Sequence, residues 1–248
     1  MARVFITGST EGLGLATADT LLRDGHEVIV HARSPQRIPA VQHLLDRGAQ
    51  CIVGDLAAQA EVRQIAADAN RIGRLDAVIH NAGVLSGAAL LPVNVVAPYV
   101  LTALIPGPRR LIYLSSGMHR GGDTGLDGLD WAGRTTTASY STTKLHVTAL
   151  SAAVARLVPG VASNAVDPGW VPTRMGGRSA PDSLELGHRT QEWLATSDDP
   201  AALAGGGYWY HQHLQAPHPA AVDPRFQDAL LSRLAEHTGL TLPESIAP

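Results

Sequence analysis

A tyrosine and a lysine four positions apart are the pair of residues in this sequence best suited to proton transfer. Tyr140 and Lys144 lie in a stretch with helical periodicity, so their side chains are expected on one face of a helix. A free phenol, with a pKa of about 10, exchanges protons poorly near neutral pH. A neighbouring ammonium group stabilises the phenolate and lowers that pKa, so Tyr140 could give or take a proton. The alternative is an incidental pair on a helix surface.

A glycine-rich turn near the N-terminus is the second chemically suggestive feature. Three glycines occur within seven positions, directly after the apolar run at residues 3–7. Glycines allow a tight turn, a close approach of the backbone to a phosphate, and close packing of a helix whose N-terminus faces the anion. The turn therefore predicts a pyrophosphate site. Its expected contacts are Gly8, Ser9, Thr10, Gly12, Leu13 and Gly14.

Apolar strands alternate with helical stretches along the chain. Strands are expected at residues 3–7, 27–31, 49–56, 75–83, 109–117 and 161–171, and helices at 13–24, 61–72, 139–157 and 226–237. This alternation predicts an α/β fold, a doubly wound parallel sheet with helices on both faces. Ligands bind such sheets beyond the carboxyl ends of the strands. Polar residues fall at those ends, namely Arg33, Asp55, Asn81, Ser116 and Asp167.

The chain, residues 1–248, is predicted to form a single domain with three parts. Residues 1–170 would supply the dinucleotide-binding core and the catalytic elements, and residues 221–248 a terminal helix and tail. Residues 171–220, rich in glycine and proline, would cover the substrate site, although an ordinary surface excursion is the alternative. His211 and His213 are expected on opposite faces of a strand, so no metal site is predicted there or elsewhere.

Composition limits the classes of partner. The net charge of -3 and the pI near 6.4 provide no basic face for nucleic acid. The single cysteine, Cys51, excludes an internal disulfide and fits a reducing cytoplasm. No apolar run approaches the roughly 20 residues that a membrane helix needs. A cytoplasmic protein that binds small molecules, with no nucleic-acid partner and no membrane span, is expected.

The ordered motifs resemble those of the short-chain dehydrogenase/reductase family, whose members have a Rossmann-type fold. Thr7 to Gly14 is similar to the family's T-G-x(3)-G-x-G turn, and Tyr140 to Lys144 to its Y-x(3)-K motif. Further elements occur in the family's order between residues 4 and 173. They are Asp55-Leu56, Asn81-Ala82-Gly83, Ser116 in "YLSSG", and Pro168-Gly169 with Val171 and Thr173.

The resemblance implies a nicotinamide cofactor and a place for each motif along it. Asp55 and Leu56 would contact the adenine, although a strand-end aspartate is often only a cap. Asn81, Ala82 and Gly83 would close over the adenosine ribose. The remaining expected cofactor contacts are Tyr140, Lys144, Pro168, Gly169, Val171 and Thr173.

The same resemblance implies the catalytic roles. Tyr140 would be the general acid/base and Lys144 would hold the nicotinamide ribose. Ser116, in preference to Ser115, would orient the carbonyl, and Asn94 would continue a proton relay through water. The stretch before Asn94 is shorter than is usual in the family, which predicts a truncated fourth helix. This places the family's usual dimer face in doubt and leaves a homo-oligomer open.

The end of the second strand bears on which nicotinamide cofactor is used. An acidic residue there would take the ribose 2′-hydroxyl, whereas an arginine accommodates a 2′-phosphate. Arg33 stands at this position and Arg37 adds charge, so NADP(H) is favoured over NAD(H). Glu11, where NADP-preferring relatives often carry a basic residue, points the other way.

The substrate is expected to be a bulky, apolar carbonyl compound or alcohol. The long segment between Ser116 and Tyr140, its His119, and the tail "GGYWYHQH" resemble the retinol-dehydrogenase-like branch of the family. The expected activity is NADPH-dependent reduction of a ketone or aldehyde. A non-catalytic NADP(H)-binding sensor and a sugar-nucleotide epimerase or dehydratase are the alternatives. Residues that could line the pocket, or simply pack in the core, are Trp131, Trp170, Met175, Trp193 and Trp209.

Overall fold

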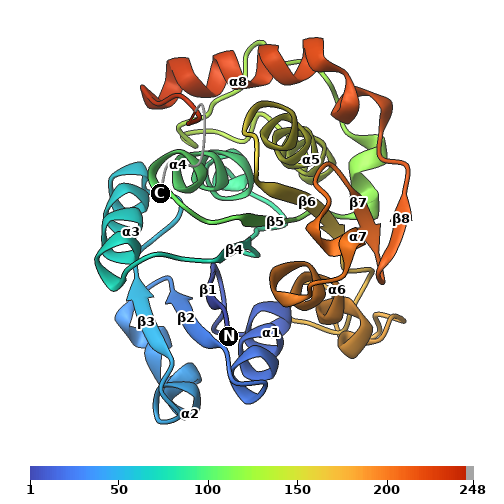
Figure 1. The fold of residues 1–248 in the computed structure, drawn as a ribbon. Helices are drawn as coiled ribbons and strands as arrows, with labels where there is room; N and C mark the ends of the chain where they lie inside the picture. The colour runs from blue at the N-terminus through green and yellow to red at the C-terminus, as the bar shows by residue number, and fades with distance from the viewer. Residues whose placement is uncertain (244–248) are drawn as a thin grey trace.

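The strands of the protein form one eight-stranded sheet (Figure 1), in a computed structural model that describes residues 1–243. The strand order is β3-β2-β1-β4-β5-β6-β7-β8. β1 to β7 pair in parallel, and β8 runs antiparallel to β7 at one edge. The strands are β1 (Arg3–Ile6), β2 (Glu27–Ala32), β3 (Gln50–Val53), β4 (Ala77–His80), β5 (Arg110–Leu114), β6 (Ala162–Asp167), β7 (Tyr208–Tyr210) and β8 (His213–Gln215). The predicted doubly wound α/β sheet is confirmed.

Helices cover both faces of this sheet, and Figure 1 shows α8 lying across α5 on the outer side of one layer. One layer consists of α1 (Gly12–Arg23) and α6 (Leu184–Thr196), with the short α2 (Gln42–Leu45) and α7 (Pro200–Leu203). The other consists of α3 (Gln59–Ile72), α4 (Ala97–Leu104) and α5 (Tyr140–Leu157), covered in part by α8 (Pro224–Thr238).

The side chains of β1 show why the strands read as continuous apolar runs. Val4 and Ile6 belong to the core beneath α1 and α6, whereas Phe5 belongs to the core beneath α3, α4 and α5. All three are fully buried. Because successive side chains of a strand point to opposite faces, a sheet covered on both sides needs apolar residues at every position.

The hairpin of β7 and β8 corrects one expectation from the sequence. His211 and His213 do not lie on opposite faces of a single strand, because His211 and Gln212 form the turn and His213 begins β8. Both turn residues have positive φ, 47° at His211 and 63° at Gln212. Two-residue hairpin turns of this kind usually carry asparagine, aspartate or glycine. The His-Gln pair therefore gave no turn signal.

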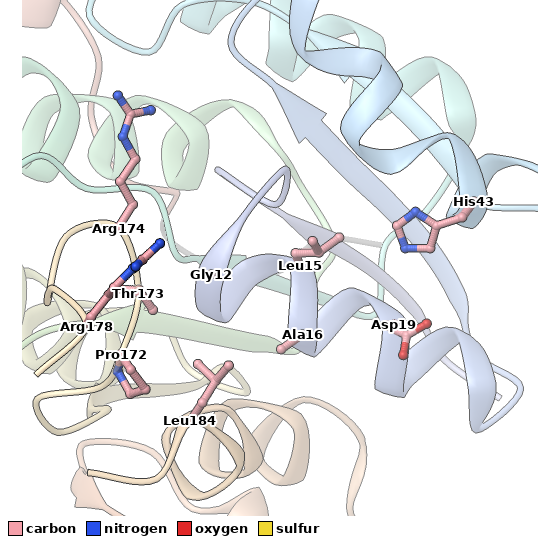
Figure 2. Close-up of a pocket in the computed structure, with 10 residues that line it drawn as sticks. All are labelled: Gly12, Leu15, Ala16, Asp19, His43, Pro172, Thr173, Arg174, Arg178 and Leu184. Atoms are coloured by element: carbon pink, nitrogen blue, oxygen red, sulfur yellow. The ribbon is translucent and has the colours of Figure 1, made fainter. Parts of the chain in front are cut away.

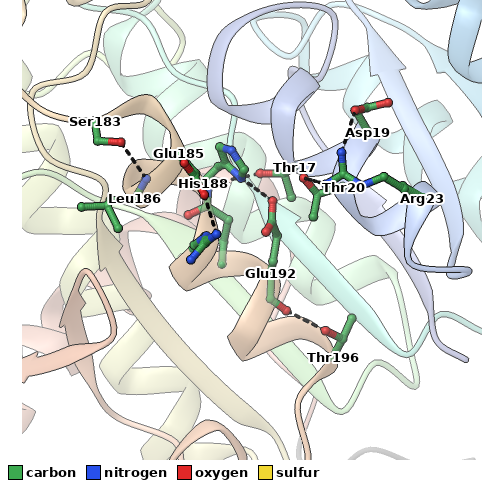
Figure 3. Close-up of polar contacts among 12 residues, drawn as sticks. Thr17, Asp19, Thr20, Arg23, Ser183, Glu185, Leu186, His188, Glu192 and Thr196 are labelled. Atoms are coloured by element: carbon green, nitrogen blue, oxygen red, sulfur yellow. Dashed lines mark hydrogen bonds and ion pairs between the residues drawn. The ribbon is translucent and has the colours of Figure 1, made fainter.

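Helix α6 is a fixed part of the layer beside α1. Figure 3 shows its polar contacts, among them Nδ1 of His188 at 2.5 Å from Oε1 of Glu192. Burial raises the pKa of the Glu192 carboxyl. The amide of Gln191 donates to the Thr17 hydroxyl of α1 at 3.2 Å. The segment expected as a cover thus contributes α6 and β7 to the sheet and its helix layer. Residues 168–183 are the part that borders the carboxyl ends of the strands.

The described part of the chain has neither a membrane-spanning helix nor a cluster of metal-binding side chains. Over residues 1–243, no helix has both the length and the apolar character that crossing a bilayer requires. In the same range, no group of three or more histidine, cysteine, aspartate or glutamate side chains is arranged to hold a metal ion.

Candidate active site

The turn after β1 has the geometry for which its glycines were singled out. Gly8 and Gly12 have positive φ, +62° and +58°, which side chains rarely tolerate. A Cβ on Gly8 would lie 2.8 Å from Cα of Ala82. A Cβ on Gly12 would meet only Thr173, so the backbone of the turn is open toward the carboxyl ends of the strands. This open turn at the start of α1 fits a bound pyrophosphate.

Asn81, just beyond β4, ties that turn to the sheet. Its side-chain amide donates to the carbonyl oxygens of Thr7 and Gly8 at 2.8 and 3.0 Å. The backbone N–H of Ala82 donates to the Thr7 hydroxyl at 3.1 Å. Gly14 is needed for the same contact, because a Cβ there would lie 2.4 Å from Nδ2 of Asn81.

Replacing Gly14 with alanine is expected to lower the free energy of unfolding by about 2 kcal/mol, the usual cost of overpacking a tight site. The added methyl group must push Asn81 away from the Thr7 and Gly8 carbonyls. Urea unfolding followed by circular dichroism measures the loss. Gly121→Ala is the control, because its Cβ would enter open space without a positive φ. Equal stability of Gly14→Ala and wild type would contradict the proposed packing.

Two groups hold the glycine turn from the other side: His31, for which the sequence predicts no role, and Ser9, which is predicted to contact the pyrophosphate. His31 accepts a hydrogen bond from the Gly8 N–H at Nδ1 (3.0 Å) and donates from Nε2 to the Gly54 carbonyl (2.8 Å). Burial lowers the pKa of His31, which matches this neutral form. The Ser9 hydroxyl accepts from the His31 N–H and donates to Ile6 within the fold. A histidine at the end of an otherwise apolar strand was the available signal.

Charged side chains gather where β2 ends. Arg33 is exposed there and lines the cavity. Arg37 donates to Glu11 at 2.7 Å and lies 3.5 Å from the Thr10 hydroxyl. Glu11 is therefore paired with an arginine, and its charge does not stand alone at this end of the site. Asp55 accepts from the Ala57 N–H at 2.9 Å and also lines the cavity, so it is a cap as well as a candidate contact.

The groups expected to do chemistry lie at the ends of β5 and α5. Tyr140 is the first residue of α5, which is capped by Ser139 accepting from the Thr142 N–H at 3.1 Å. The Ser116 hydroxyl lies close enough to the Tyr140 phenol to lower its pKa. Lys144 donates to the Leu114 carbonyl at 2.6 Å, and its Nζ lies 5.4 Å from the centre of the Tyr140 ring. The fold thus brings Ser116, Tyr140 and Lys144 together.

The two serines after β5 differ in their surroundings. Ser115 is buried, and its hydroxyl lies 2.6 Å from that of Thr148 and 3.4 Å from the Lys144 carbonyl. Ser116 is partly exposed and caps a short 3₁₀ turn, Gly117–Gly121, by accepting from the Met118 N–H at 3.2 Å. Ser116 is thus the serine whose hydroxyl influences the Tyr140 phenol, while Ser115 bonds to α5.

The turn that carries Ser116 is anchored by a histidine from its own last residues. His119 is fully buried and contacts the Ser116 carbonyl through Nδ1 at 2.8 Å. Its Nε2 accepts the backbone N–H of His218 at 2.9 Å, so Nδ1 carries the proton and donates to Ser116. Burial lowers the pKa of His119, consistent with a neutral ring.

The proton affinities of the central pair differ from the sequence expectation. The pKa of Tyr140 is raised to about 12, chiefly by burial and to a smaller extent by the Asp167 carboxylate, against a lowering by the nearby Ser116 hydroxyl. The pKa of Lys144 is lowered to about 8, because the effect of burial exceeds the opposing effect of the Asp167 carboxylate. The lowering expected for Tyr140 is therefore absent in the protein alone. Lys144 bonds to Leu114 and faces the phenol ring, so it does not offset the desolvation of a phenolate.

Asn94 lies in a π-helical turn, Pro92–Val96, directly before α4. Its side chain accepts from the Val84 N–H at 2.8 Å and donates to the Val84 carbonyl and the Thr143 hydroxyl, both at 3.0 Å. The Thr143 hydroxyl in turn donates to the Tyr140 carbonyl at 2.8 Å. Asn94 thus connects the chain after β4 to the first turn of α5, and α4 beyond it is short, as predicted.

The chain after β6 closes the site on its far side. Gly169 has a positive φ of +81°, and its N–H donates to Asp167 at 3.0 Å. Thr173 approaches the glycine turn, because its methyl carbon would lie 3.2 Å from a Cβ on Gly12. This segment therefore spans from the end of β6 to the start of α1.

A single cavity of about 1170 Å³ connects these features. Of the expected cofactor contacts, all but Ser9 and Gly14 line it, together with Ser116. Ser9 and Gly14 are used inside the turn, and Asn94 lies behind the cavity wall. The cavity therefore runs from the arginines at the end of β2 to Tyr140.

The apolar part of the cavity is only partly the one expected. Trp170 and Met175 line it and are exposed. Leu85 and Met118, which sequence reasoning missed, are also exposed lining residues. Three tryptophans lie elsewhere. Trp131 is in the core near His146, while Trp193 and Trp209 pack edge to face with centroids 5.0 Å apart.

A second, open groove of about 720 Å³ lies on the outer side of the glycine turn. Figure 2 shows it between α1 with His43 of α2 on one side and residues 172–178 with Leu184 on the other. Its Asp19 carboxylate pairs with Arg47 at 2.5 Å. The groove shares Gly12, Thr173 and Arg174 with the main cavity but contains none of the expected catalytic side chains.

A doubly wound sheet, a glycine turn entering its first helix, and a cavity along the carboxyl ends of the strands together define a dinucleotide-binding protein of the Rossmann class. Comparison with known proteins narrows this class. The family model described as short chain dehydrogenase matches residues 2–99. The short-chain dehydrogenase chry4 of Gibberella zeae is 37% identical over 98% of this chain and 99% of its own length. Human retinol dehydrogenase 13 is 27% identical, over 97% of this chain and 85% of its own length.

Solved structures agree on the fold. An uncharacterized protein from Mycobacterium paratuberculosis superposes with a TM-score of 0.79 and 23% identity, covering 98% of this chain and 95% of that one. The Pseudomonas aeruginosa RhlG/NADP complex superposes with a TM-score of 0.67 and 20% sequence identity. The match covers 84% of this chain and 94% of the RhlG chain. With its full-length similarity to chry4, the chain belongs to the short-chain dehydrogenase/reductase family. It is an oxidoreductase of that family, which uses NAD(P).

Proposed function

We propose that this oxidoreductase uses NADP(H) to reduce a bulky, apolar ketone or aldehyde. One observation carries the proposal. A single cavity joins Arg33 and Arg37 at one end to Ser116, Tyr140 and Lys144 at the other. The open backbone at Gly12 lies between them and fits the pyrophosphate of a dinucleotide.

The roles of the reacting groups follow from their contacts. When bound, the reduced nicotinamide supplies the hydride. Tyr140, a phenol with a pKa of about 12, is protonated at neutral pH and gives its proton to the carbonyl oxygen of the substrate. Ser116, whose hydroxyl lies beside the Tyr140 phenol, donates its single O–H to that oxygen and stabilises its developing charge. The Lys144 ammonium, 5.4 Å from the centre of the Tyr140 ring, places a positive charge close to the group that loses the proton.

The proposed preference for NADP(H) rests on the arginines at the end of β2. Ala32 offers no carboxylate for a ribose 2′-hydroxyl, and Arg33 is exposed and free to face a 2′-phosphate. Because Arg37 already balances Glu11, the glutamate does not oppose that phosphate as a bare charge. The solved RhlG relative, described as an NADP complex, is consistent with this preference.

Arg33→Ala is expected to lower the affinity for NADPH about tenfold and to leave the affinity for NADH nearly unchanged. The reason is that a charge-assisted hydrogen bond contributes about 1.5 kcal/mol or more to binding. Fluorescence titration with both cofactors measures the two dissociation constants. Arg178→Ala is the matched control, because Arg178 lies in the outer groove and does not line the main cavity. Equal weakening of NADPH and NADH would show that Arg33 does not contact the 2′-phosphate.

The proposed substrate class rests on the cavity rim. Leu85, Met118, Trp170 and Met175 all keep more than two fifths of their surface exposed at the cavity, with values from 43% to 59%. Large exposed apolar side chains around a cavity favour an apolar ligand that covers them. Residues 168–183, which include Trp170 and Met175, would form the substrate cover.

The test of the proposed function is a spectrophotometric assay. The purified protein is mixed with NADPH and a panel of fused-ring ketones, aromatic aldehydes and small aliphatic ketones. Loss of the reduced-nicotinamide absorbance with the fused-ring members, and slower loss with acetone, is expected. Turnover with sugar nucleotides in preference to all ketones, or none with any carbonyl compound, would overturn the proposal.

A further inference from the structure

The cavity contains a buried carboxylate that has no part in the proposed hydride or proton transfer. Asp167 is the last residue of β6, lines the cavity and is only 9% exposed. Its Oδ1 accepts from the Gly169 N–H at 3.0 Å, and its Oδ2 from the Tyr208 hydroxyl at 3.2 Å. Both donors are neutral. A buried carboxylate without a cationic partner is costly, so its position calls for a compensating charge nearby.

The geometry places that carboxylate at the reacting centre. Leu114, which holds Lys144 through its carbonyl, is the register partner of Val166, the residue before Asp167. The Lys144 ammonium, held by the last residue of β5, and Asp167, the last residue of β6, therefore lie at the ends of adjacent strands. On the other side, a Cβ on Gly117 would lie 3.0 Å from Oδ2 of Asp167. The carboxylate thus packs against the residue that follows Ser116, and a glycine there makes the room.

The other charged and titratable groups around Asp167 leave Lys144 as its compensating cation. His119 of the 3₁₀ turn is neutral, because its Nε2 accepts the His218 N–H. The guanidinium of Arg120 lies over the Tyr208 ring, 5.3 Å from its centre, and donates to the Ala216 carbonyl. That guanidinium is thus engaged by the Tyr208 ring and the Ala216 carbonyl, and among the described residues no hydrogen bond or ion pair joins it to Asp167.

The remaining neighbours are acids or phenols. Asp182, from the segment before α6, accepts from the Trp170 N–H at 2.6 Å. Tyr208 and Tyr210 of β7 both have pKa values raised by burial and by the nearby carboxylates, so both are neutral phenols. None of these groups can balance the charge of Asp167.

We propose that Asp167 is a positioning residue of this site. Its carboxylate supplies the counter-charge that keeps Lys144 an ammonium and Tyr140 a phenol, and so keeps the site ready to give a proton to a carbonyl. The influence of Asp167 on both neighbours is consistent with this role, because it raises the pKa of Lys144 and that of Tyr140. The part concerning Tyr140 rests on the proposed function, whereas the part concerning Lys144 does not.

Lys144 is the only lysine among the 248 residues, which makes the test direct. Untagged protein grown with lysine labelled with ¹³C at Cε gives a single side-chain signal. Its titration by NMR reports the ionisation of Lys144 without cofactor, substrate or turnover. In Asp167→Asn the titration midpoint is expected to fall by about one pH unit relative to wild type, the effect of removing one nearby opposite charge.

Asp182→Asn is the matched control, since it removes a carboxylate from the same cavity. Its lysine midpoint is expected to equal that of wild type. If Asp167→Asn does not fold, as judged by circular dichroism, Asp167→Ser provides a second uncharged variant. An unchanged midpoint in a folded Asp167 variant would overturn the inference and leave Asp167 as a cap of the turn at Gly169.

A kinetic measurement separates this inference from the proposed function. With NADPH and the ketone of the panel that is reduced fastest, the alkaline limb of the pH–rate profile is expected at lower pH in Asp167→Asn. The direction is the same whether Tyr140 or Lys144 sets the limb, because Asp167 raises the pKa of both. A limb that stays in place contradicts the role of Asp167. A Tyr140→Phe variant that keeps its turnover contradicts the proposed function instead, and does not affect the lysine titration.

Discussion

Tyr140→Phe is expected to lower kcat/KM for carbonyl reduction by about a thousandfold, within the range that general acid catalysis contributes. The substitution removes only the phenol oxygen, the atom that contacts Ser116 and would face the substrate carbonyl. NADPH affinity is expected to change by less than about threefold, because the ring remains beside Lys144. Steady-state kinetics and fluorescence titration measure the two quantities on one preparation.

Tyr210→Phe is the matched control for that experiment. Tyr210 lines the same cavity from β7, and the substitution removes the same atom. It is expected to change KM for the ketone more than kcat. If the Tyr140 variant lost cofactor affinity as strongly as rate, the general-acid assignment would be wrong, and Tyr140 would be a binding residue.

Lys144→Met is expected to abolish turnover and yet to make the cofactor-free protein more stable at pH 7. Burial lowers the pKa of Lys144 from 10.5 to about 8, so folding must bury an ammonium at neutral pH. That shift corresponds to about 3 kcal/mol, and loss of the bond to the Leu114 carbonyl takes back about 1 kcal/mol. A net gain of about 2 kcal/mol in the free energy of unfolding is expected.

The stability gained by the Lys144→Met variant is expected to depend on pH in a defined direction. Between pH 8 and 10.5 the folded wild-type protein binds fewer protons at Lys144 than the unfolded chain, so its stability rises with pH across this window. Below pH 8 the lysine is charged in both states and the cost is constant. The advantage of the methionine variant should therefore be largest below pH 8 and disappear above about pH 10. Urea unfolding at several pH values measures it. An advantage that persists unchanged at high pH would mean that packing, and not charge burial, is its cause.

The features predicted correctly from the sequence are those encoded locally. The glycine turn and the Tyr140–Lys144 spacing depend on a few neighbouring residues. Each strand before β7 was predicted from an apolar run in the sequence. For the hairpin of β7 and β8 the sequence predicts a single strand through His211 and His213, because both strands are short and their turn lacks a typical turn residue. Each of these three-residue strands is defined by its pairing with the other, which the local sequence does not reveal.

The features that escaped prediction depend on contacts between distant segments. Nothing local distinguishes Trp170, at the cavity, from Trp193 and Trp209, which pack on each other in the core. The proton affinity of Tyr140 likewise depends on burial and on a carboxylate from β6. Such quantities are set by the packed sheet and not by motif spacing.

The bond between His119 and His218 has a consequence for how the protein is made. His218 leaves the ribosome only after the glycine turn and β1 to β7 have been synthesised, yet its N–H fixes the ring that holds the Ser116 turn. The residues that contact the glycine turn, His31, Asn81 and Thr173, all precede His218 in the chain. A nascent chain ending before Pro217 would therefore contain the whole glycine turn but lack the backbone group that fixes the His119 ring against the Ser116 turn.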